Sequence, residues 1–209
     1  MKKSVVFGLA VVIAAAFFFV VFGSSTFEAQ QAEAAAPTVE SLQVGSVIQF
    51  GGYDWRVLDV QGNKALIITE HIIEQRPYNV DNKDVTWETC TLREYLNGEF
   101  LQKFSAEDQA RIAETRINNP NNQQYGTNGG NDTNDKIFLL SIEEANRYFS
   151  SDSERIAKVA NGTASWWWLR SPGLLSFGAA GVHDDGLVNV AGGVVSDGGG
   201  VRPALYLNL

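Results

Sequence analysis

The sequence predicts an α+β domain in which strands outnumber helices, and three observations support this class. Residues 46–70 alternate apolar and polar side chains with the period of β-strands. The middle of the chain, from about residue 91 to 160, carries helix-start patterns followed by apolar residues at helical spacing. Residues 166–209 are too rich in glycine for helices, since each glycine costs about 1 kcal/mol relative to alanine in a helix interior. This C-terminal tract is therefore expected to form short strands and hairpins.

The alternating N-terminal segment predicts three strands joined by tight turns, a β-meander. The strands are expected at SVIQF (46–50), YDWRVLDV (53–60) and KALIITE (64–70). Gly51-Gly52 and Gly62-Asn63 lie between them, and these residue types accept the positive φ of hairpin turns. A ligand platform is an alternative role for the tryptophan of the second strand. The side chains expected to face the core are Trp55, Val57, Leu66 and Ile68.

Capping patterns predict four short helices in the middle of the chain. Thr91 with Glu94 heads the first helix, and Ser105 with Asp108 heads a shorter one that runs to about Glu114. Two more capping boxes open SIEEANRYF (141–149) and SERIAKVA (153–160), with Ser141 and Ser151 as caps and Asn161-Gly162 closing the last helix. The first helix presents an apolar face formed by Leu92, Tyr95, Leu96, Phe100, Leu101 and Phe104.

A long Asn- and Gly-rich loop, NNPNNQQYGTNGGNDTND, spans Asn118 to Asp135. Its amides and carboxylates are suited to capping turns, and they are also oxygen ligands that Ca²⁺ prefers. The EF-hand spacing from Asp132 fails, because Lys136 and Ile137 stand where an oxygen ligand and a glycine belong. An irregular structural Ca²⁺ site and a turn-rich covering loop both remain open.

The N-terminus has the pattern of an export segment. Lys2 and Lys3 precede an apolar run from Val5 to Phe22, and an alanine cluster stands before Pro37. The 18-residue run would be about 27 Å long as a helix, close to the thickness of a bilayer core. Two interpretations remain. One is a signal cleaved at the Ala-x-Ala sites Ala32/Ala34 or Ala34/Ala36, and the other is a retained anchor.

From this pattern we expect residues 1–36 to be a signal peptide or membrane anchor with a polar linker, and residues 37–209 to form one domain. The protein would then be secreted or anchored at the outer face of the cytoplasmic membrane. Contact with the membrane is expected only through the N-terminal segment.

Composition excludes several classes of function. The net charge is -8 at pH 7, so the surface repels phosphate backbones and nucleic acid is not an expected partner. Cys90 is the single cysteine, so the chain cannot form an internal disulfide or a CxxC zinc site. Phosphate-binding loops, dinucleotide fingerprints and HExxH motifs are absent from the sequence.

Catalysis by histidine has one candidate in the C-terminal tract. His183 stands beside Asp184 and Asp185, and a carboxylate beside an imidazole can orient a base. Neighbouring residues on a strand point in opposite directions, however, so adjacency in sequence is not a dyad. We therefore expect a protein without catalytic residues, although paired carboxylates for glycoside hydrolysis need only meet in space.

The C-terminal tract favours ligand binding. Strand alternation places Trp166 and Trp168 on one face and Trp167 on the other, and exposed aromatic rings suit a recognition surface. Polar residues on a glycine-rich frame offer adaptable hydrogen bonding, although ordinary hairpin tips have the same composition. Arg170 and Arg202 are expected to fix the strands through carbonyls or a buried acid. The predicted ligand-binding residues are Trp166, Trp168, Ser176, Phe177, His183, Asp184, Asp185, Asn189, Ser196 and Asp197.

Several segments together carry a family resemblance. In order they are GSVIQFGGYDWRVLDV, ALIITEHII, PYN, TWETCTLREYLNGEF, YGTNGGNDTNDKIFLLSIEEANRYF, WWWLRSPG and GVRPAL. This combination, from about Val44 to Leu209, resembles a family of domains of unknown function from exported bacterial proteins. That family in turn resembles the C-type-lectin-like fold, shared with formylglycine-generating enzymes and the variable proteins of diversity-generating retroelements.

The resemblance implies a scaffold for ligand display, with a small sheet, flanking helices and a binding surface on the C-terminal strands and loops. The active-site cysteines of the formylglycine-generating enzymes are missing, since Cys90 is alone, so oxidase chemistry is not implied. The Ca²⁺ ligands of sugar-binding lectins are also missing from the C-terminal half. The expected function is recognition of a protein or glycan outside the cell. The alternatives are an envelope structural or assembly module, and a hydrolase or oxidase descendant.

Overall fold

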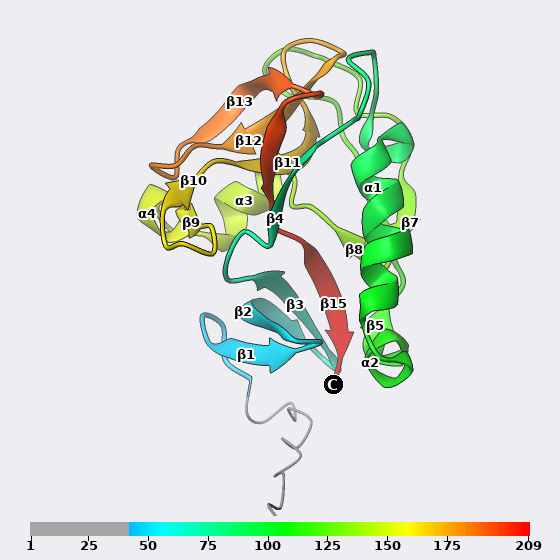
Figure 1. The fold of residues 1–209 in the computed structure, drawn as a ribbon, viewed down its shortest axis with the longest axis vertical. Helices are drawn as coiled ribbons and strands as arrows, with labels where there is room; N and C mark the ends of the chain where they lie inside the picture. The colour runs from blue at the N-terminus through cyan, green and yellow to red at the C-terminus, as the bar shows by residue number, and fades with distance from the viewer. Residues whose placement is uncertain (1–41) are drawn as a thin grey trace, which may run out of the picture. The chain divides into compact units, whose positions relative to one another are not determined.

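The computed structural model describes residues 42–209, which fold into two main β-sheets with four short helices (Figure 1). The expected signal or anchor at residues 1–36 lies outside the described residues. Within residues 42–209, no helix has the length and apolar character needed to cross a membrane. The architecture is α+β with mostly strands, as the sequence predicts.

The first sheet contains the predicted meander and the last strand of the chain. Its order is β1-β2-β3-β15-β5, and β8 also pairs with β15. The turns at Gly51-Gly52 and Gly62 have positive φ, as expected, and Trp55, Val57, Leu66 and Ile68 are buried. The strands of this sheet are β1 (Val47–Phe50), β2 (Tyr53–Gln61), β3 (Lys64–Thr69), β5 (Ile112–Ala113), β8 (Ile137–Phe138) and β15 (Ala204–Asn208).

The second sheet is formed mainly by the glycine-rich C-terminal tract. Its order is β13-β12-β11-β14-β4, with β11 and β14 parallel and the other pairs antiparallel. Two small two-stranded sheets, β6 with β7 and β9 with β10, complete the strand pairing. The strands are β4 (Glu74–Pro77), β6 (Thr115–Ile117), β7 (Thr133–Asp135), β9 (Ala157–Lys158), β10 (Ala164–Ser165), β11 (Trp167–Pro172), β12 (Gly178–Val182), β13 (Val188–Val194) and β14 (Gly198–Val201).

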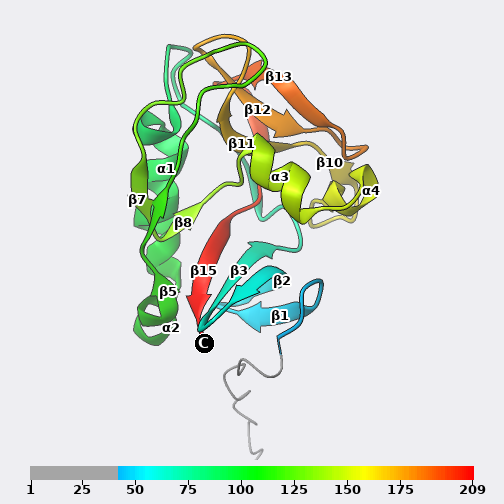
Figure 2. The same cartoon turned by 180° about the vertical axis from the view of Figure 1, so that it is seen from behind.

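Two of the four helices are shorter than the sequence predicts, and the other two have about the predicted extent. After α1, helical turns continue through Leu96–Phe100 and Leu101–Lys103, and the predicted apolar face is buried except for Leu101, which is partly buried. Figure 2 shows α3 and α4 beside the second sheet. The helices are α1 (Thr91–Tyr95), α2 (Ala106–Arg111), α3 (Ile142–Tyr148) and α4 (Asp152–Arg155).

All four helices begin within one residue of the predicted start, but only two of the predicted side-chain caps are confirmed. Ser141 and Glu144 form the capping box of α3, and the Ser105 side chain accepts from Asp108 N–H at α2. At α1 the cap is the Cys90 sulfur, which accepts from Arg93 N–H, and not Thr91. Ser151 makes no side-chain cap at α4.

The predicted helix at residues 153–160 is also wrong beyond Arg155. The chain there turns into the β9–β10 hairpin, where Gly162, with a φ of +85°, belongs to the turn instead of closing a helix. The helix predicted to run to Glu114 likewise ends at Arg111, because Ile112 and Ala113 pair with β15. In both cases strand pairing replaces local helix propensity, within a hairpin in the first case and with a distant strand in the second.

Two of the passages of the chain between the sheets, β3 to β4 and β14 to β15, are adjacent. Backbone bonds tie these crossings together, from Ile73 N to Val201 O (3.0 Å) and from Thr69 N to Pro203 O (2.9 Å). The buried Arg202 donates from Nε to Thr69 O at 2.8 Å and lies over the ring of Trp167 at 5.1 Å. The predicted structural role of this arginine is confirmed.

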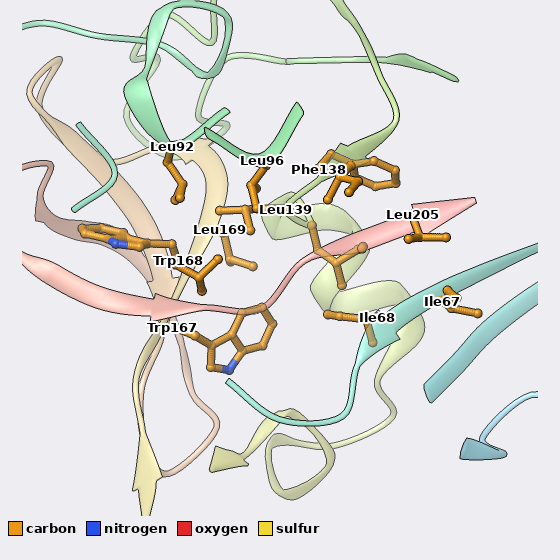
Figure 3. Packing of buried hydrophobic residues seen from close by; sticks show 14 of the residues in the cluster. Ile67, Ile68, Leu92, Leu96, Phe138, Leu139, Trp167, Trp168, Leu169 and Leu205 are labelled. Atoms are coloured by element: carbon orange, nitrogen blue, oxygen red, sulfur yellow. The ribbon is translucent and has the colours of Figure 1, made fainter. Parts of the chain in front are cut away.

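The hydrophobic core lies between the sheets and α1 (Figure 3). Leu92 and Leu96 from the helical segment meet Leu169 of β11, and Ile68 and Leu205 come from the first sheet. Both sheets therefore share one core, and side chains of the first sheet pack with side chains of the second.

Candidate functional site

A cleft of about 270 Å³ opens in the second sheet at the hairpin formed by β12 and β13. We call it the Trp166 cleft. Four of the ten predicted binding residues line it, although they come from four separate parts of the C-terminal tract. The lining residues are Trp166, Gly181, Val182, His183, Asn189, Gly193 and Asp197.

Glycines in the sheet create space for the aromatic wall of the cleft. A Cβ on Gly199 would lie 2.4 Å from Trp168 Nε1 and 2.5 Å from Trp166 Cη2, so both indoles lie directly against this glycine. The two indoles meet edge to face, with ring centroids 4.6 Å apart. The predicted alternation is confirmed, because Trp167 takes the other face and donates its indole N–H to Arg155 O at 3.0 Å.

Trp166 and Trp168 share a face but differ in exposure. Trp168 is fully buried, donates from Nε1 to Arg76 O at 2.9 Å, and packs 5.7 Å from the ring of Tyr78. Its predicted role as a ligand contact is therefore wrong, because β4 and the segment after it cover its ring. Trp166 is only partly buried and lines the cleft.

A shift in strand register sets the orientation of Asn189. The pairing of β12 with β13 is irregular between Ala179 and Gly181, and Asn189 stands opposite Gly181. The Asn189 Oδ1 atom accepts from Gly192 N at 3.0 Å, which fixes the amide plane. The Nδ2 group makes no hydrogen bond within residues 42–209 and is a donor available to a ligand.

The tip of the same hairpin is anchored on α4. Arg155 donates from Nε to Gly186 O at 2.9 Å, and Gly186 has a φ of +89°. A Cβ at Gly186 would lie 1.8 Å from Asp152 O, so no larger residue fits at this contact. This anchor holds His183, at the start of the turn, beside the cleft.

The carboxylate of Asp197 gives the lining of the cleft its negative charge. Asp197 is the only carboxylate among the lining residues, and no lysine or arginine lines the cleft. Neither the His183 imidazole nor the Asp197 carboxylate makes a hydrogen bond or ion pair within the described part of the chain. The cleft thus offers an aromatic wall, an amide donor, an imidazole and a carboxylate acceptor.

The other predicted site residues lie outside the cleft. Asp184 and Asp185 are exposed at the hairpin tip, where Asp185 Oδ1 accepts from Leu187 N. Ser176 donates to Asp84 Oδ1 at 2.6 Å in a loop, and Phe177 beside it is partly buried. Ser196 is exposed in the turn before β14. Gly181, Val182 and Gly193 also line the cleft, and they were not predicted. The only sequence feature that pointed to this region was the regular spacing of glycines in the tract.

The Asn-rich loop uses its side chains to cap backbone groups. The buried Asn122 amide donates to Pro172 O at 2.8 Å and to Val190 O at 3.0 Å. The pKa of Asp132 is lowered by a hydrogen bond from Asn119 N–H and by Arg116. Within residues 42–209, no group of three or more metal-ligating side chains is found. These contacts match the turn-capping alternative for this loop.

Two buried groups outside the cleft are structural. Arg170 pairs with Glu144 and donates to Leu139 O at 2.8 Å, which confirms the expected structural role. Burial raises the pKa of the Cys90 thiol to about 12, so the thiolate does not form near neutral pH. The hydrogen bonds of this cysteine serve the start of α1.

Comparison with known proteins identifies the domain. Residues 62–209 match the domain of unknown function DUF6273. The chain belongs to this family. Searches of curated proteins and of solved structures gave no match. The DUF6273 match covers every strand of the second sheet, and so the whole Trp166 cleft.

Proposed function

We propose that this DUF6273 domain is an exported, non-enzymatic binding module whose ligand site is the Trp166 cleft. The observation that carries this proposal is the cleft itself. A partly buried tryptophan and three polar side chains with free hydrogen-bonding groups converge there from separate segments. Ligand sites commonly combine an apolar wall with a few oriented polar groups, and rigid aromatic side chains contribute much of the binding energy.

The chemistry of the remaining reactive groups supports a binding role over catalysis. The raised pKa of Cys90 and its burial remove the only thiol as a nucleophile at neutral pH. Asp184 and Asp185 follow His183 but are exposed at the hairpin tip, and neither makes a hydrogen bond to its imidazole. The proposal for export comes from the pattern of residues 1–36 alone.

We also propose a C-type-lectin-like architecture for the domain. Three features support it: the first sheet holds both the N-terminal meander and the last strand, helices flank the sheets, and the cleft lies on C-terminal strands and turns. The flanking helices and the C-terminal position of the cleft are what the sequence resemblance implies for ligand display.

The test is a binding screen of the full-length protein against arrays of glycans and of extracellular peptides and proteins. Binding should be lost in Trp166→Ala, because the aromatic wall is removed. Tyr125→Ala is the matched control, since Tyr125 is an exposed aromatic residue in the Asn-rich loop, outside the cleft. Equal binding by wild type and Trp166→Ala would exclude the cleft as the site.

An envelope assembly module is the second candidate, and one observation favours it. Leu174 and Leu175 are about half exposed, side by side, in the loop between β11 and β12. Exposed apolar pairs are suited to contacts with another protein. Cross-linking in whole cells would distinguish the candidates, since an assembly module should lose its partners in Leu174→Ser/Leu175→Ser and keep them in Trp166→Ala.

A further inference from the structure

We infer that the ligand of the Trp166 cleft is a neutral carbohydrate, bound through one pyranose ring. This inference rests on the proposed binding function and specifies its ligand class. Four properties of the cleft support it: the aromatic wall, the mixture of donors and acceptors, the absence of lysine and arginine from the lining, and the size.

The aromatic wall suits the C–H face of a sugar ring. Trp166 lies against Gly199, and its edge-to-face contact with the buried Trp168 holds the indole in one orientation. A fixed aromatic surface offers a large apolar contact area at little cost in side-chain entropy. A pyranose has such an apolar face together with hydroxyl groups at its rim.

The polar groups match hydroxyls better than they match a single charge. Asn189 presents a donor, because its Oδ1 is already occupied by Gly192 N–H. Asp197 presents only acceptors, and an imidazole such as that of His183 can offer both. A hydroxyl group both donates and accepts, so one ligand with several hydroxyls can satisfy all three side chains.

Charged ligands fit the same cleft less well. An anion would meet the Asp197 carboxylate with no lysine or arginine in the lining to pair with it. An ammonium group would pair with Asp197 and the Trp166 ring, but it would leave the Asn189 donor without an acceptor. A neutral polyhydroxylated ring leaves no such group unpaired.

The size of the cleft limits how much of a glycan it holds. At about 270 Å³ it lies just below the range of about 300–1,000 Å³ typical of sites for drug-sized ligands. One ring is therefore expected inside the cleft, with the rest of the chain in solvent. A single ring buries little surface, so we expect a dissociation constant on the order of 1 mM for a monosaccharide.

The test is an NMR titration of the full-length protein with methyl glycosides of neutral hexoses and N-acetylhexosamines. Lysine methyl ester is the cationic probe in a parallel titration. The reporters are the Trp166 indole N–H and the Asn189 side-chain amide. We expect saturable shifts of both signals with at least one methyl glycoside and none with the cation.

The variant Asn189→Asp separates the ligand classes by the sign of its effect. It keeps the acceptor for Gly192 N–H but replaces the donor with a second carboxylate, so sugar affinity should fall about tenfold. Affinity for a cation would rise instead. Ser176→Ala, a polar change outside the cleft, should alter sugar affinity less than about twofold.

The outcomes separate this inference from the function on which it rests. Glycoside binding weakened by Asn189→Asp supports both. Binding of the cation, strengthened by Asn189→Asp, overturns the carbohydrate inference and keeps the binding function. If neither probe shifts the reporters and the array ligands do not depend on Trp166, the inference and the proposed function both fail.

Discussion

The first and second sheets are built from different kinds of residues and present different surfaces. In β3 of the first sheet, Ala65 to Thr69 are all buried, so both faces are covered. In β13 of the second sheet, every residue from Val188 to Val194 is partly exposed. The first sheet owes its stability to bulky side chains, whereas the second uses glycines to make room for indoles.

This difference explains where the cleft lies. Trp166 and Trp168 occupy the face above Gly199, and Gly193 and Gly181 present no side chains to fill the space beside them. The Trp166 cleft therefore lies beside the indoles, where Gly181 and Gly193 leave space. A sheet of bulky residues such as the first would have filled this space with side chains.

The largest expected effect tests the two tryptophan environments. Trp55→Ala in β2 should lower the free energy of unfolding by about 3–5 kcal/mol, because it removes a fully buried indole that donates to Phe50 O at 2.8 Å. Trp166→Ala should cost only about 1–2 kcal/mol, since part of its surface is already in water. Urea unfolding of both variants is the measurement. Equal losses would show that Trp166 is a core residue and not a binding surface.

The second effect concerns two groups that ionise at alkaline pH, one on the first sheet and one at the start of α1. Burial raises the pKa of Tyr206, on β15, to about 12, and it raises the pKa of Cys90, at the start of α1, from 9.0 to about 12. The unfolded chain ionises first in both cases, so stability is complete below pH 9 and falls as the pH rises toward 12. The buried Cys90 contributes a loss of up to about 1.4 kcal/mol per pH unit, and the partly buried Tyr206 contributes less because solvent screens its charge.

Unfolding measured from pH 8 to 11 in single variants would separate the two groups. Cys90→Ala should flatten the decline that begins near pH 9, and Tyr206→Phe should flatten the part that begins near pH 10, the ordinary value for tyrosine. Burial also raises the pKa of Tyr78, so some alkaline loss should persist in either variant. A profile unchanged by Cys90→Ala would mean that the thiol is accessible to water.

The three N-terminal strands of the first sheet could be predicted because their signals are local. Alternation with period two and glycine pairs at the turns fix β1, β2 and β3 within the chain segment itself. The Ser141 cap is local as well, and it is confirmed. Helix prediction failed after Arg155, where the guanidinium binds Gly186 O and the next residues pair in the β9–β10 hairpin.

The cleft could be predicted only in part, because its assembly depends on distant contacts. The sequence indicates the right tract, and Trp166, His183, Asn189 and Asp197 do meet there. The burial of Trp168 depends on Arg76 and Tyr78, about 90 residues earlier in the chain. The irregular pairing of β12 with β13, which brings Asn189 opposite Gly181, has no sequence pattern of its own.

The smallest expected effect tests the role of glycine directly, at two neighbouring positions of β14. A Cβ at Gly199 would lie 2.4 Å from Trp168 Nε1 and 2.5 Å from Trp166 Cη2, whereas a Cβ at Gly198 would meet nothing within 4 Å. Gly199→Ala should therefore lower the free energy of unfolding by about 1–3 kcal/mol, because the indoles must move. Gly198→Ala should change it by less than about 0.5 kcal/mol.

The same pair of variants connects packing to binding. Gly199 does not line the Trp166 cleft, so any loss of ligand affinity in Gly199→Ala must come from displacement of Trp166. We expect weaker binding in Gly199→Ala and unchanged binding in Gly198→Ala, measured in the same titration as the wild type. If Gly199→Ala binds normally while it is destabilised, the indole moves toward the core and the cleft wall does not depend on this glycine.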